Sequence, residues 1–317
     1  MGGHAESRAL QIYLPIAELP VSIFLVLGMA AAVGFISGLF GVGGGFLMTP
    51  LLVFIGIPPS VAVATGAAQI AASSTTGVLS FWRRKALDVR LGALLVAGGM
   101  VGTLFGVLFF NAMRRAGYFE LVLVLSYVTL LGSVGGLMLI ESLKATFMPN
   151  RIRTQRPTKA QGRWWFETLP FPVKFERSQI VISAIPVVTL GLFIGFVGAV
   201  LGIGGGFMVV PALIYFFRVP TAVVVGTSLF QILFTMITAT ILHAITNQSV
   251  DIVLALILII GSVIGAQFGA RAGQNLKGEH FRLLLALLVF GVALRFALEI
   301  GVTPKEPFSI EQLEPKP

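Results

Sequence analysis

The sequence has no cysteine, only three histidines and only 13 acidic residues in a chain of 317 residues. The absence of cysteine excludes disulfides, thiolate metal sites and cysteine nucleophiles, and the scarcity of histidines and acids argues against a buried catalytic metal. Charged residues make up only 11% of the chain, against about 25% in an ordinary soluble domain. A soluble globule of this size could not cover its surface with so few charges. This argues against a cytosolic enzyme, a nucleic-acid-binding protein or a disordered chain.

Hydrophobic residues make up 56% of the chain and lie in long runs. Runs of about 20 residues are enough to cross roughly 30 Å of hydrocarbon as a helix, so we expect a polytopic α-helical membrane protein. The first run begins near Leu19 and lacks a small-residue cleavage site, which favours a retained span over a signal peptide. The net charge of +9 does not require nucleic acid, because surplus Lys and Arg in membrane proteins usually mark cytoplasmic loops.

One sequence pattern occurs twice. The segment Gly-Val-Gly-Gly-Gly-Phe at 41–46 recurs as Gly-Ile-Gly-Gly-Gly-Phe at 202–207, which is 161 residues further on. The pair Gln-Ile at 69–70 recurs at 231–232, an offset of 162. Such order and spacing indicate two homologous halves. The expected organisation is an N-terminal tail, a first transmembrane repeat, a basic cytoplasmic connecting loop, a second transmembrane repeat and a C-terminal tail, over residues 1–18, 19–140, 141–178, 179–300 and 301–317.

Each half is expected to contain five segments. A long apolar span runs into the glycine cluster, an apolar piece of about 12 residues follows, and three further spans complete the half. About 12 residues are too few to cross the bilayer comfortably, so the short piece is expected to be a broken or re-entrant helix. The predicted fold is an all-α polytopic membrane protein whose two homologous halves each have four full spans and one short helix. The expected segments are 19–40, 46–57, 59–81, 88–110 and 118–140, then 179–201, 207–217, 221–243, 251–270 and 281–300.

The orientation depends on how the short piece is counted. If it crosses the membrane, the halves are inverted and 16 of the 22 Lys and Arg face the cytoplasm; if it re-enters, the halves are parallel and 15 do so. We favour the inverted arrangement because inverted repeats recur in transporters. Arg114 and Arg115 fall on the outer side in both arrangements. The basic loop 141–178 is expected to touch anionic lipid, and a regulatory or partner-binding role is the alternative.

The glycine clusters predict an anion site. Consecutive glycines do not sustain a helix, and unwound backbone at membrane depth is tolerated only where it is buried in protein or lines a cavity. Bare backbone N–H groups and the positive N-terminus of the following helix both favour a negative ligand. The alternative is tight helix packing or a hinge without ligand contact. The candidate binding residues are Gly43, Gly44, Gly45, Gly204, Gly205 and Gly206.

A polar stripe follows each glycine cluster, on one face of a predicted helix. Its members are uncharged hydrogen-bonding residues at i, i+4, i+8 and i+11, and they could replace the water around an oxyanion without placing a fixed charge in the membrane. Serine and threonine can instead bond their own helix backbone, which is the stronger interpretation for any single threonine but not for the two glutamines. The candidate residues are Thr65, Gln69, Ser73 and Thr76, repeated as Thr227, Gln231, Thr235 and Thr238, with Ser228 beside Thr227.

Titratable residues inside the predicted spans are few. His243, near the end of the second stripe helix, is a candidate for proton coupling, although a satisfied interfacial histidine is the favoured interpretation. Its counterpart in the first half is Phe81. No carboxylate is expected in mid-membrane, which argues against an acid relay and against cation transport.

Other repeated residues are expected to be structural. Asp88 and Asp251 occupy matching span starts and are expected to cap helices. Small residues at four-residue spacing allow helices to approach closely, and two such rows occur in matching spans. The rows are Gly98, Gly102 and Gly106 in the first half and Gly261, Gly265 and Gly269 in the second.

The duplicated motifs resemble those of the TauE/SafE sulfite-exporter family. The two glycine motifs are each followed by a proline, Pro50 and Pro211, and the segment 225–231 is similar to the second motif of that family. The resemblance covers both halves, about 260 residues. It implies a transporter that moves small sulfur-containing anions, such as sulfite, sulfoacetate or other sulfonates, or thiosulfate, across the bacterial inner membrane.

We therefore expect a secondary transporter that works by alternating access and exports such an anion, because an inside-negative potential drives anions outward. No nucleotide-binding motif, cofactor site or catalytic constellation stands out in the sequence, so an enzyme is not expected. The expected partners are the anion and membrane lipid, with no nucleic acid, and a homo-oligomer is left open. An anion channel and an uptake permease for an organosulfonate are the alternatives.

Overall fold

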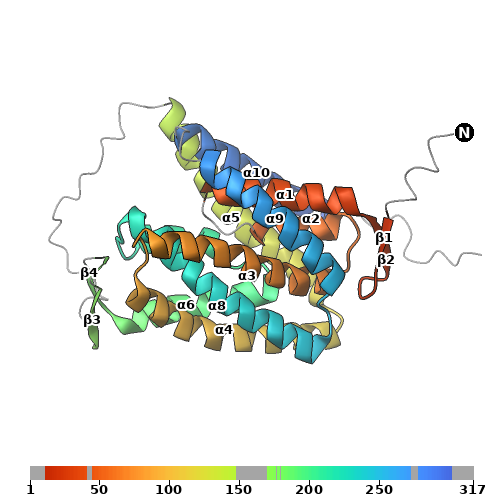
Figure 1. Cartoon of the computed structure of the whole chain (residues 1–317), viewed down its shortest axis with the longest axis horizontal. Helices are drawn as coiled ribbons and strands as arrows, with labels where there is room; N and C mark the ends of the chain where they lie inside the picture. Colours follow the sequence, from red (N-terminus) through yellow and green to blue (C-terminus); the bar gives the residue numbers. More distant parts are fainter. Residues whose placement is uncertain are drawn as a thin grey trace, which may run out of the picture. The chain divides into compact units, whose positions relative to one another are not determined.

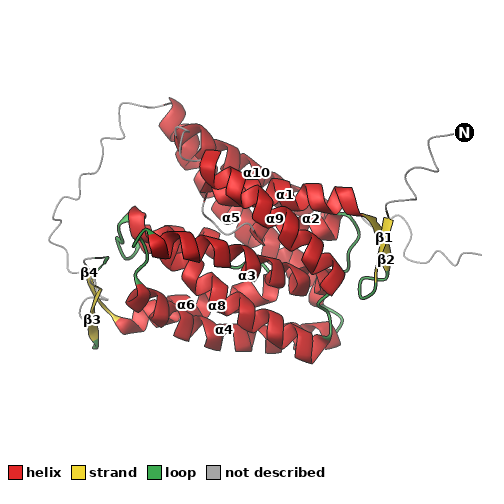
Figure 2. Cartoon of the chain, viewed as in Figure 1, coloured by secondary structure: helices red, strands yellow, loops and turns green. Residues whose placement is uncertain are grey.

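The computed structural model describes residues 11–40, 45–147, 170–175, 177–178, 180–272 and 278–301, and these residues are mostly helical (Figures 1 and 2). Among them, five helices are long and apolar enough to cross a membrane. These candidate spans are Val89–Arg115, Phe119–Leu137, Ala184–Leu201, Val223–Asn247 and Ile252–Gly269. Shorter apolar helices are Ile23–Gly38, Gly45–Phe54 and Ala286–Leu298. The chain is therefore a multi-pass helical membrane protein.

Each predicted half contains five described helices, and the second helix of each half is the shortest. The described helices of the first half are α1 (Ile23–Phe40), α2 (Gly45–Phe54), α3 (Pro59–Arg83), α4 (Val89–Arg115) and α5 (Phe119–Phe147). Those of the second half are α6 (Ala184–Leu201), α7 (Gly206–Tyr215), α8 (Thr221–Asn247), α9 (Ile252–Ala272) and α10 (Gly278–Gly301). Helices α2 and α7, which follow the glycine clusters, have 10 residues each.

A short antiparallel hairpin precedes α1 and another precedes α6, and the sequence analysis predicted neither. The strands are β1 (Gln11–Leu14), β2 (Leu19–Ser22), β3 (Pro172–Phe175) and β4 (Ile180–Ser183). The expectation of an all-α chain is wrong in this respect, and α1 begins at Ile23 and α6 at Ala184 rather than at 19 and 179. The second strand of each hairpin runs directly into an apolar helix, so hydropathy does not mark the boundary between them.

The helices form two compact units, and the described candidate site residues all belong to the first. Unit 1 comprises 1–123 and 150–278, and unit 2 comprises 124–149 and 279–317. Within unit 2, the later part of α5 packs on α10, where the Tyr127 ring stacks on Phe296 with a centroid distance of 5.2 Å. A Cβ on Gly135 would lie 3.0 Å from the backbone nitrogen of Phe290, so the two helices approach closely there.

Glycine allows close packing of two helix pairs in unit 1, α1 with α9 and α4 with α6. A Cβ on Gly102 of α4 would overlap the backbone of Leu192 in α6, and a Cβ on Gly265 of α9 would overlap the backbone of Ala31 in α1. The prediction that the glycine rows permit close helix approach is confirmed at these positions. Each pair joins a helix of the first half to a helix of the second. Helices α3 and α8 pack on each other between the pairs, α3 also against α9 and α8 also against α4 and α6.

Asp88 caps α4 and ties it to two other elements. Its carboxylate accepts hydrogen bonds from the Leu91 nitrogen at 3.2 Å and from the nitrogen and hydroxyl of Ser178, beside β4, at 3.0 and 2.7 Å. Its own backbone N–H donates to the Thr227 hydroxyl of α8 at 3.1 Å. The predicted helix cap is confirmed, and the same residue anchors α8 and the second hairpin.

Asp251 does the same for α9. Its carboxylate accepts from the Leu254 nitrogen at 3.0 Å and from the backbone nitrogens of Ile16 and Ala17, in the turn of the first hairpin, at 3.0 and 3.4 Å. Its backbone N–H donates to the Thr65 hydroxyl of α3 at 3.1 Å. The two halves therefore use matching Asp–Thr pairs to hold the beginnings of α3 and α8.

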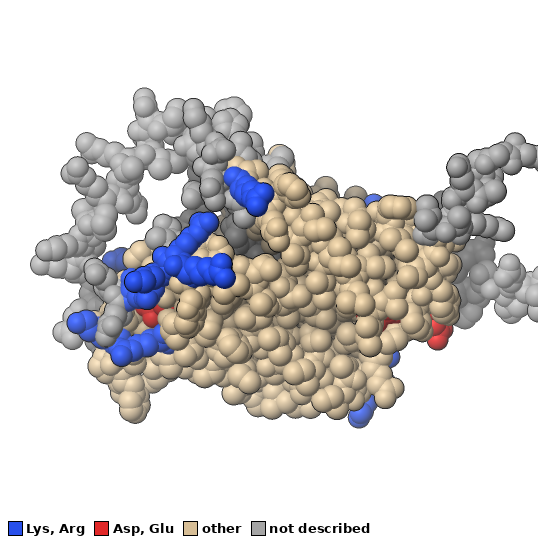
Figure 3. Space-filling view, in the orientation of Figure 1, with Lys and Arg blue, Asp and Glu red and all other residues tan. Residues whose placement is uncertain are grey.

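Basic side chains gather at one end of unit 1 (Figure 3). Arg83 and Arg84 lie at the end of α3, and Arg271 lies in the last turn of α9. All three line one cavity, and we call this end of unit 1 the cavity end. Helix α4 begins just after the end of α3 and runs for 27 residues to Arg114 and Arg115. These two arginines therefore lie at the opposite end of unit 1, which we call the far end.

Candidate functional site

The second glycine cluster forms a buried break between α6 and α7. Gly202, Gly204 and Gly205 have φ angles of 66°, 69° and 74°. Because a Cβ makes these angles unfavourable, the break requires glycine. Gly206 then begins α7, and all four residues are buried.

The beginnings of the two short helices lie together in the interior of unit 1. Gly45 is the first residue of α2, whereas Gly43 and Gly44 lie outside the described residues. The Phe46 ring, next in α2, lies 5.8 Å from the ring of Phe207 in the first turn of α7. The positive ends of two helices thus approach each other, and a helix N-terminus favours negative charge.

The described break packs against neighbouring helices in this conformation. Thr49 of α2 donates through its hydroxyl to the carbonyl oxygen of Gly202 at 3.0 Å. A Cβ on Gly204 would lie 3.0 Å from a methyl group of Ile70 and 3.2 Å from one of Ile232. These contacts are those of the packing alternative, and a role of the glycine backbone as an anion ligand stays a prediction.

The two stripe glutamines are buried without satisfied amides. Gln69 of α3 is 1% exposed and Gln231 of α8 is fully buried. The oxygen of Gln69 and both polar atoms of Gln231 have no hydrogen-bond partner. An unsatisfied buried polar group costs about 1–3 kcal/mol, so three such atoms on two adjoining helices call for a functional explanation.

The stripe hydroxyls occupy different places. Thr65 and Thr227 accept the aspartate N–H groups described above, whereas Ser73 and Thr76 line a cavity. Several hydroxyls donate to carbonyl groups of their own helix, as the alternative for single residues predicts: Ser73, Thr76, Thr227, Ser228, Thr235 and Thr238. An anion would have to draw these hydrogens away from the helix backbone, so their assignment as ligands stays a prediction.

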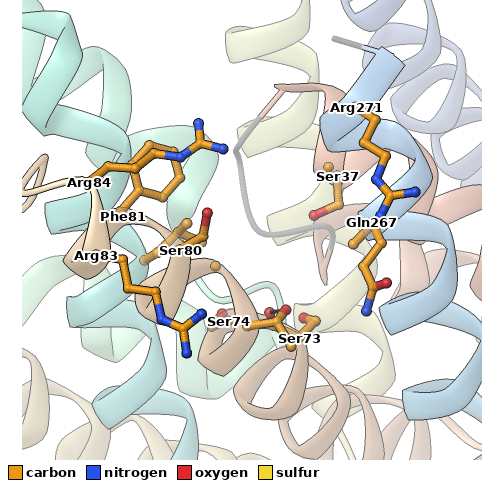
Figure 4. A pocket seen from close by; sticks show the side chains of 14 residues that line it. Ser37, Ser73, Ser74, Ser80, Phe81, Arg83, Arg84, Gln267 and Arg271 are labelled. Carbon is orange, nitrogen blue, oxygen red and sulfur yellow. Dashed lines mark hydrogen bonds between the residues drawn. The ribbon is translucent and has the colours of Figure 1, made fainter. Parts of the chain in front are cut away.

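A cavity of about 560 Å³ opens between α3 and the pair α1 and α9, with part of α8 in its wall (Figure 4). Helix α3 contributes Ser73, Ser74, Thr76 and Ser80, which span about two turns, and the Ser74 hydroxyl is buried without a partner. Opposite them lie Ser37 of α1 and Gln267 of α9. Among the described residues that line the cavity, none is acidic.

Three arginines supply positive charge to this cavity. Arg83 and Arg84 come from the end of α3, and Arg271 comes from the opposite wall (Figure 4). A guanidinium group is permanently charged and presents five N–H donors, so an oxyanion in the cavity would find donors that the helix backbone does not occupy.

Several of these cavity residues were not predicted, although the sequence contains a signal for them. The spacing of Ser73 and Thr76 continues along the helix to Ser80 and Arg83, whereas the expectation for arginine was only that its surplus marks cytoplasmic loops. Arg271 and Gln267 are four residues apart on α9 and therefore share a face. Only tertiary packing brings that face opposite α3.

His243 is a buried histidine at the junction of three helices. Its Nε2 lies 3.1 Å from the carbonyl oxygen of Ala199 in α6, and its Nδ1 lies 3.0 Å from the side-chain nitrogen of Asn247. Because a carbonyl can only accept, Nε2 donates and Nδ1 accepts, which one neutral tautomer satisfies. The ring packs edge-on against Phe110 of α4 at 4.6 Å. These contacts fit a satisfied interfacial histidine, and proton coupling stays a prediction.

Comparison with known proteins gives one consistent result. A family model described as Sulfite exporter TauE/SafE matches residues 26–296. The chain is 28% identical over 278 residues to the probable membrane transporter protein YjnA of Bacillus subtilis, which covers 86% of this chain and 100% of that protein. It is 29% identical over 285 residues to a probable membrane transporter protein of Xylella fastidiosa (strain 9a5c), with 86% and 94% covered. No solved structure matches the chain. Because the family model spans both halves, the chain belongs to the TauE/SafE family of membrane transporters.

Proposed function

We propose that the chain is a secondary transporter that exports a small sulfur-containing anion across the bacterial inner membrane by alternating access. Sulfite, a sulfonate such as sulfoacetate, and thiosulfate are the candidate substrates. The family is described as sulfite exporters, and the relatives are described as probable membrane transporters.

The arginine-lined cavity is the observation that carries this proposal. Its three guanidinium groups and its serine hydroxyls can replace the hydration shell of an oxyanion, and guanidinium pairs well with planar or multi-oxygen anions. The described lining contains no carboxylate, so a cation would meet repulsion without compensation.

The path from the cavity toward the interior follows α3. Ser80, Ser73 and Gln69 succeed one another at intervals of seven and four residues, on one helix face. The unsatisfied amides of Gln69 and Gln231 are then the ligands at the centre, where an anion would provide the partner that the Gln231 side-chain nitrogen lacks. The starts of α2 and α7 add favourable dipoles there.

We also propose that the halves are inverted repeats and that the cavity end faces the cytoplasm. The ends of α3 and α8 are equivalent in sequence, yet α3 ends where α4 begins and Arg114 near the end of α4 donates to the Asn247 carbonyl at the end of α8. Equivalent ends thus lie at opposite ends of unit 1. The arginines at the cavity end satisfy the positive-inside rule. An inside-negative potential then favours export by about 2.3 kcal/mol per charge at 100 mV.

Ligand-dependent thermal unfolding of the purified protein tests the binding step. A ligand that binds only the native state raises the melting temperature, so we expect sulfite, thiosulfate or sulfoacetate to raise it more than sulfate or chloride does. The variants R84Q and R271Q should lose this response. The control K174Q removes an exposed positive charge of β3 that does not line the cavity, and it should keep the response. If no sulfur anion stabilises the protein, or if K174Q loses the response equally, the proposal fails.

A further inference from the structure

Equivalent residues of the two halves are in contact at the far end but line the open cavity at the cavity end. His243 of α8 bonds to Ala199 of α6. Their counterparts, at offsets of 162 and 161 residues, are Phe81 of α3 and Gly38 of α1, and both line the cavity.

A second equivalent pair behaves in the same way. The terminal methyl group of Met236 in α8 would lie 3.1 Å from a Cβ on Gly198 of α6, and Met236 is fully buried. The counterparts at the same offsets are Ser74 and Ser37. Both of these serines line the cavity. The last part of α8 is therefore packed on α6, whereas the last part of α3 is separated from α1 by the cavity.

The beginnings of the same two helices do not differ. Thr65 of α3 and Thr227 of α8 are each held by the backbone N–H of an aspartate at 3.1 Å. The asymmetry is thus confined to the later parts of α3 and α8. Both helices are held alike where they begin, and they differ in whether their later parts are packed against a neighbouring helix.

A smaller cavity lies beyond His243 at the far end. Its volume is about 300 Å³, and it is lined by Arg114, Arg115, Asn111, Thr246 and Asn247. Asn247 therefore touches this cavity and also contacts His243. Arg114 and Arg115 are the pair that opposes the positive-inside rule, and an anion-receiving role explains why two arginines stand there.

We propose that His243 is the gate that closes the far end, and that Arg114 and Arg115 receive the anion beyond it. The inference rests on the proposed transport of an anion and adds the residue that must move. For the anion to pass, His243 must leave Ala199 and Phe110, and the end of α8 must separate from α6 and α4. The end of α3 would then close on α1, bringing Phe81 to Gly38.

Cysteine labelling tests the gate directly, because the chain has no cysteine of its own. The reporters are the equivalent positions Ser73→Cys, in the open cavity, and Thr235→Cys, which is fully buried. A membrane-impermeant maleimide should label S73C from the cavity end and leave T235C protected. The substitution H243F, added to T235C, keeps a ring against Phe110 but removes the hydrogen bond to Ala199. In this double variant, the cysteine at position 235 should be labelled from the far end about 5-fold faster, as expected for the loss of one hydrogen bond.

Two further variants separate gating from general damage. H243Q can still donate to the Ala199 carbonyl and should keep T235C protected. T240A removes a hydroxyl that donates to the Met236 carbonyl of the same helix, α8, and it should also keep the protection. If T235C reacts as fast as S73C without any gate variant, or if H243F leaves the protection unchanged in a protein that still unfolds cooperatively, the gate is refuted. Labelling needs no substrate, so the gate can be tested even if the protein does not transport a sulfur anion.

Transport of sulfite in proteoliposomes tests the role of Arg114 and Arg115. When sulfite is offered at the far end, the variant R114Q/R115Q should need about 3- to 10-fold more sulfite to half-saturate transport. This is the effect expected for the loss of charge-assisted contacts at an exposed site. The value for sulfite offered at the cavity end should not change. An equal change from both sides, or none, contradicts the assignment.

Discussion

Gln69 and Gln231 contain three of the unsatisfied polar atoms among the buried side chains that the structure describes. A side chain kept for stability would have partners, because burying an amide without them is unfavourable. A side chain kept for binding a transient ligand has no reason to be satisfied when that ligand is absent. The two interpretations predict opposite effects of replacing the amide with an apolar group of similar size.

The variant Q231M should therefore separate stability from transport. Removing two unsatisfied atoms should leave the free energy of unfolding unchanged or raise it by about 1–3 kcal/mol, while transport is lost. Thermal unfolding and a flux assay on the same preparation check both parts. A control, T240V, removes a hydroxyl that donates to the Met236 carbonyl of its own helix, and it should keep transport. Destabilisation by Q231M would instead indicate a structural role.

The capping aspartates give the opposite expectation. D88A and D251A each remove a helix cap and the bonds to a hairpin, so each should lower the free energy of unfolding by about 2 kcal/mol or more. Chemical denaturation in detergent measures this loss. E120A alters an exposed acid in the first turn of α5 and should cost less than about 1 kcal/mol. Equal effects of all three variants would contradict the role assigned to the caps.

At the scale of the helices, we expect the close packing at glycine to determine which helices move together. The pairs α1 with α9 and α4 with α6 touch backbone to backbone, so each pair is expected to behave as one rigid body. At Gly99 of α4 and Gly198 of α6, the nearest atoms of α8 are side-chain atoms, of Thr235 and Met236. A boundary made of side-chain contacts can open and close with less rearrangement than one in which backbones interlock.

The variant G102A tests the rigid pair of α4 and α6. A single Cβ there overlaps the backbone of Leu192, and overpacking of this kind typically costs about 1–3 kcal/mol. The matched variant G28A lies in α1, where a Cβ meets nothing within 4 Å, and it should be neutral or stabilising because alanine is the better helix former. Melting temperatures of the two variants provide the comparison. Equal stability would show that the helices are not packed as closely as described.

The sequence predicted the approximate positions of the described helices and the break between α6 and α7, because hydropathy and glycine act locally. The break at Gly202–Gly205, the caps at Asp88 and Asp251 and the close approach at Gly102 all follow from properties of the residues themselves. The hairpins escaped detection because the second strand of each runs directly into an apolar helix, so hydropathy does not mark where the helix begins. The cavity escaped because it depends on which face of α9 lies opposite Ser73 and Arg84, and long-range packing alone decides that.

For the whole molecule, the charge distribution and the absence of cysteine make sidedness measurable. Lys85, in the turn after α3, and Gln248, after α8, are both exposed and lie at opposite ends of unit 1. We expect K85C to react with an impermeant maleimide only in inside-out vesicles and Q248C only in right-side-out vesicles. Reaction of both from the same side would be evidence for parallel halves.

We propose that this membrane transporter carries a sulfur-containing anion through the arginine-lined cavity and past Gln231. The decisive measurement is flux in proteoliposomes with a clamped membrane potential, with sulfite, thiosulfate and sulfoacetate measured beside chloride. We expect saturable flux of at least one sulfur anion that follows the potential, is abolished by R84Q and Q231M and persists in K174Q. Flux that does not saturate, chloride flux of equal size, or undiminished flux in Q231M would contradict it.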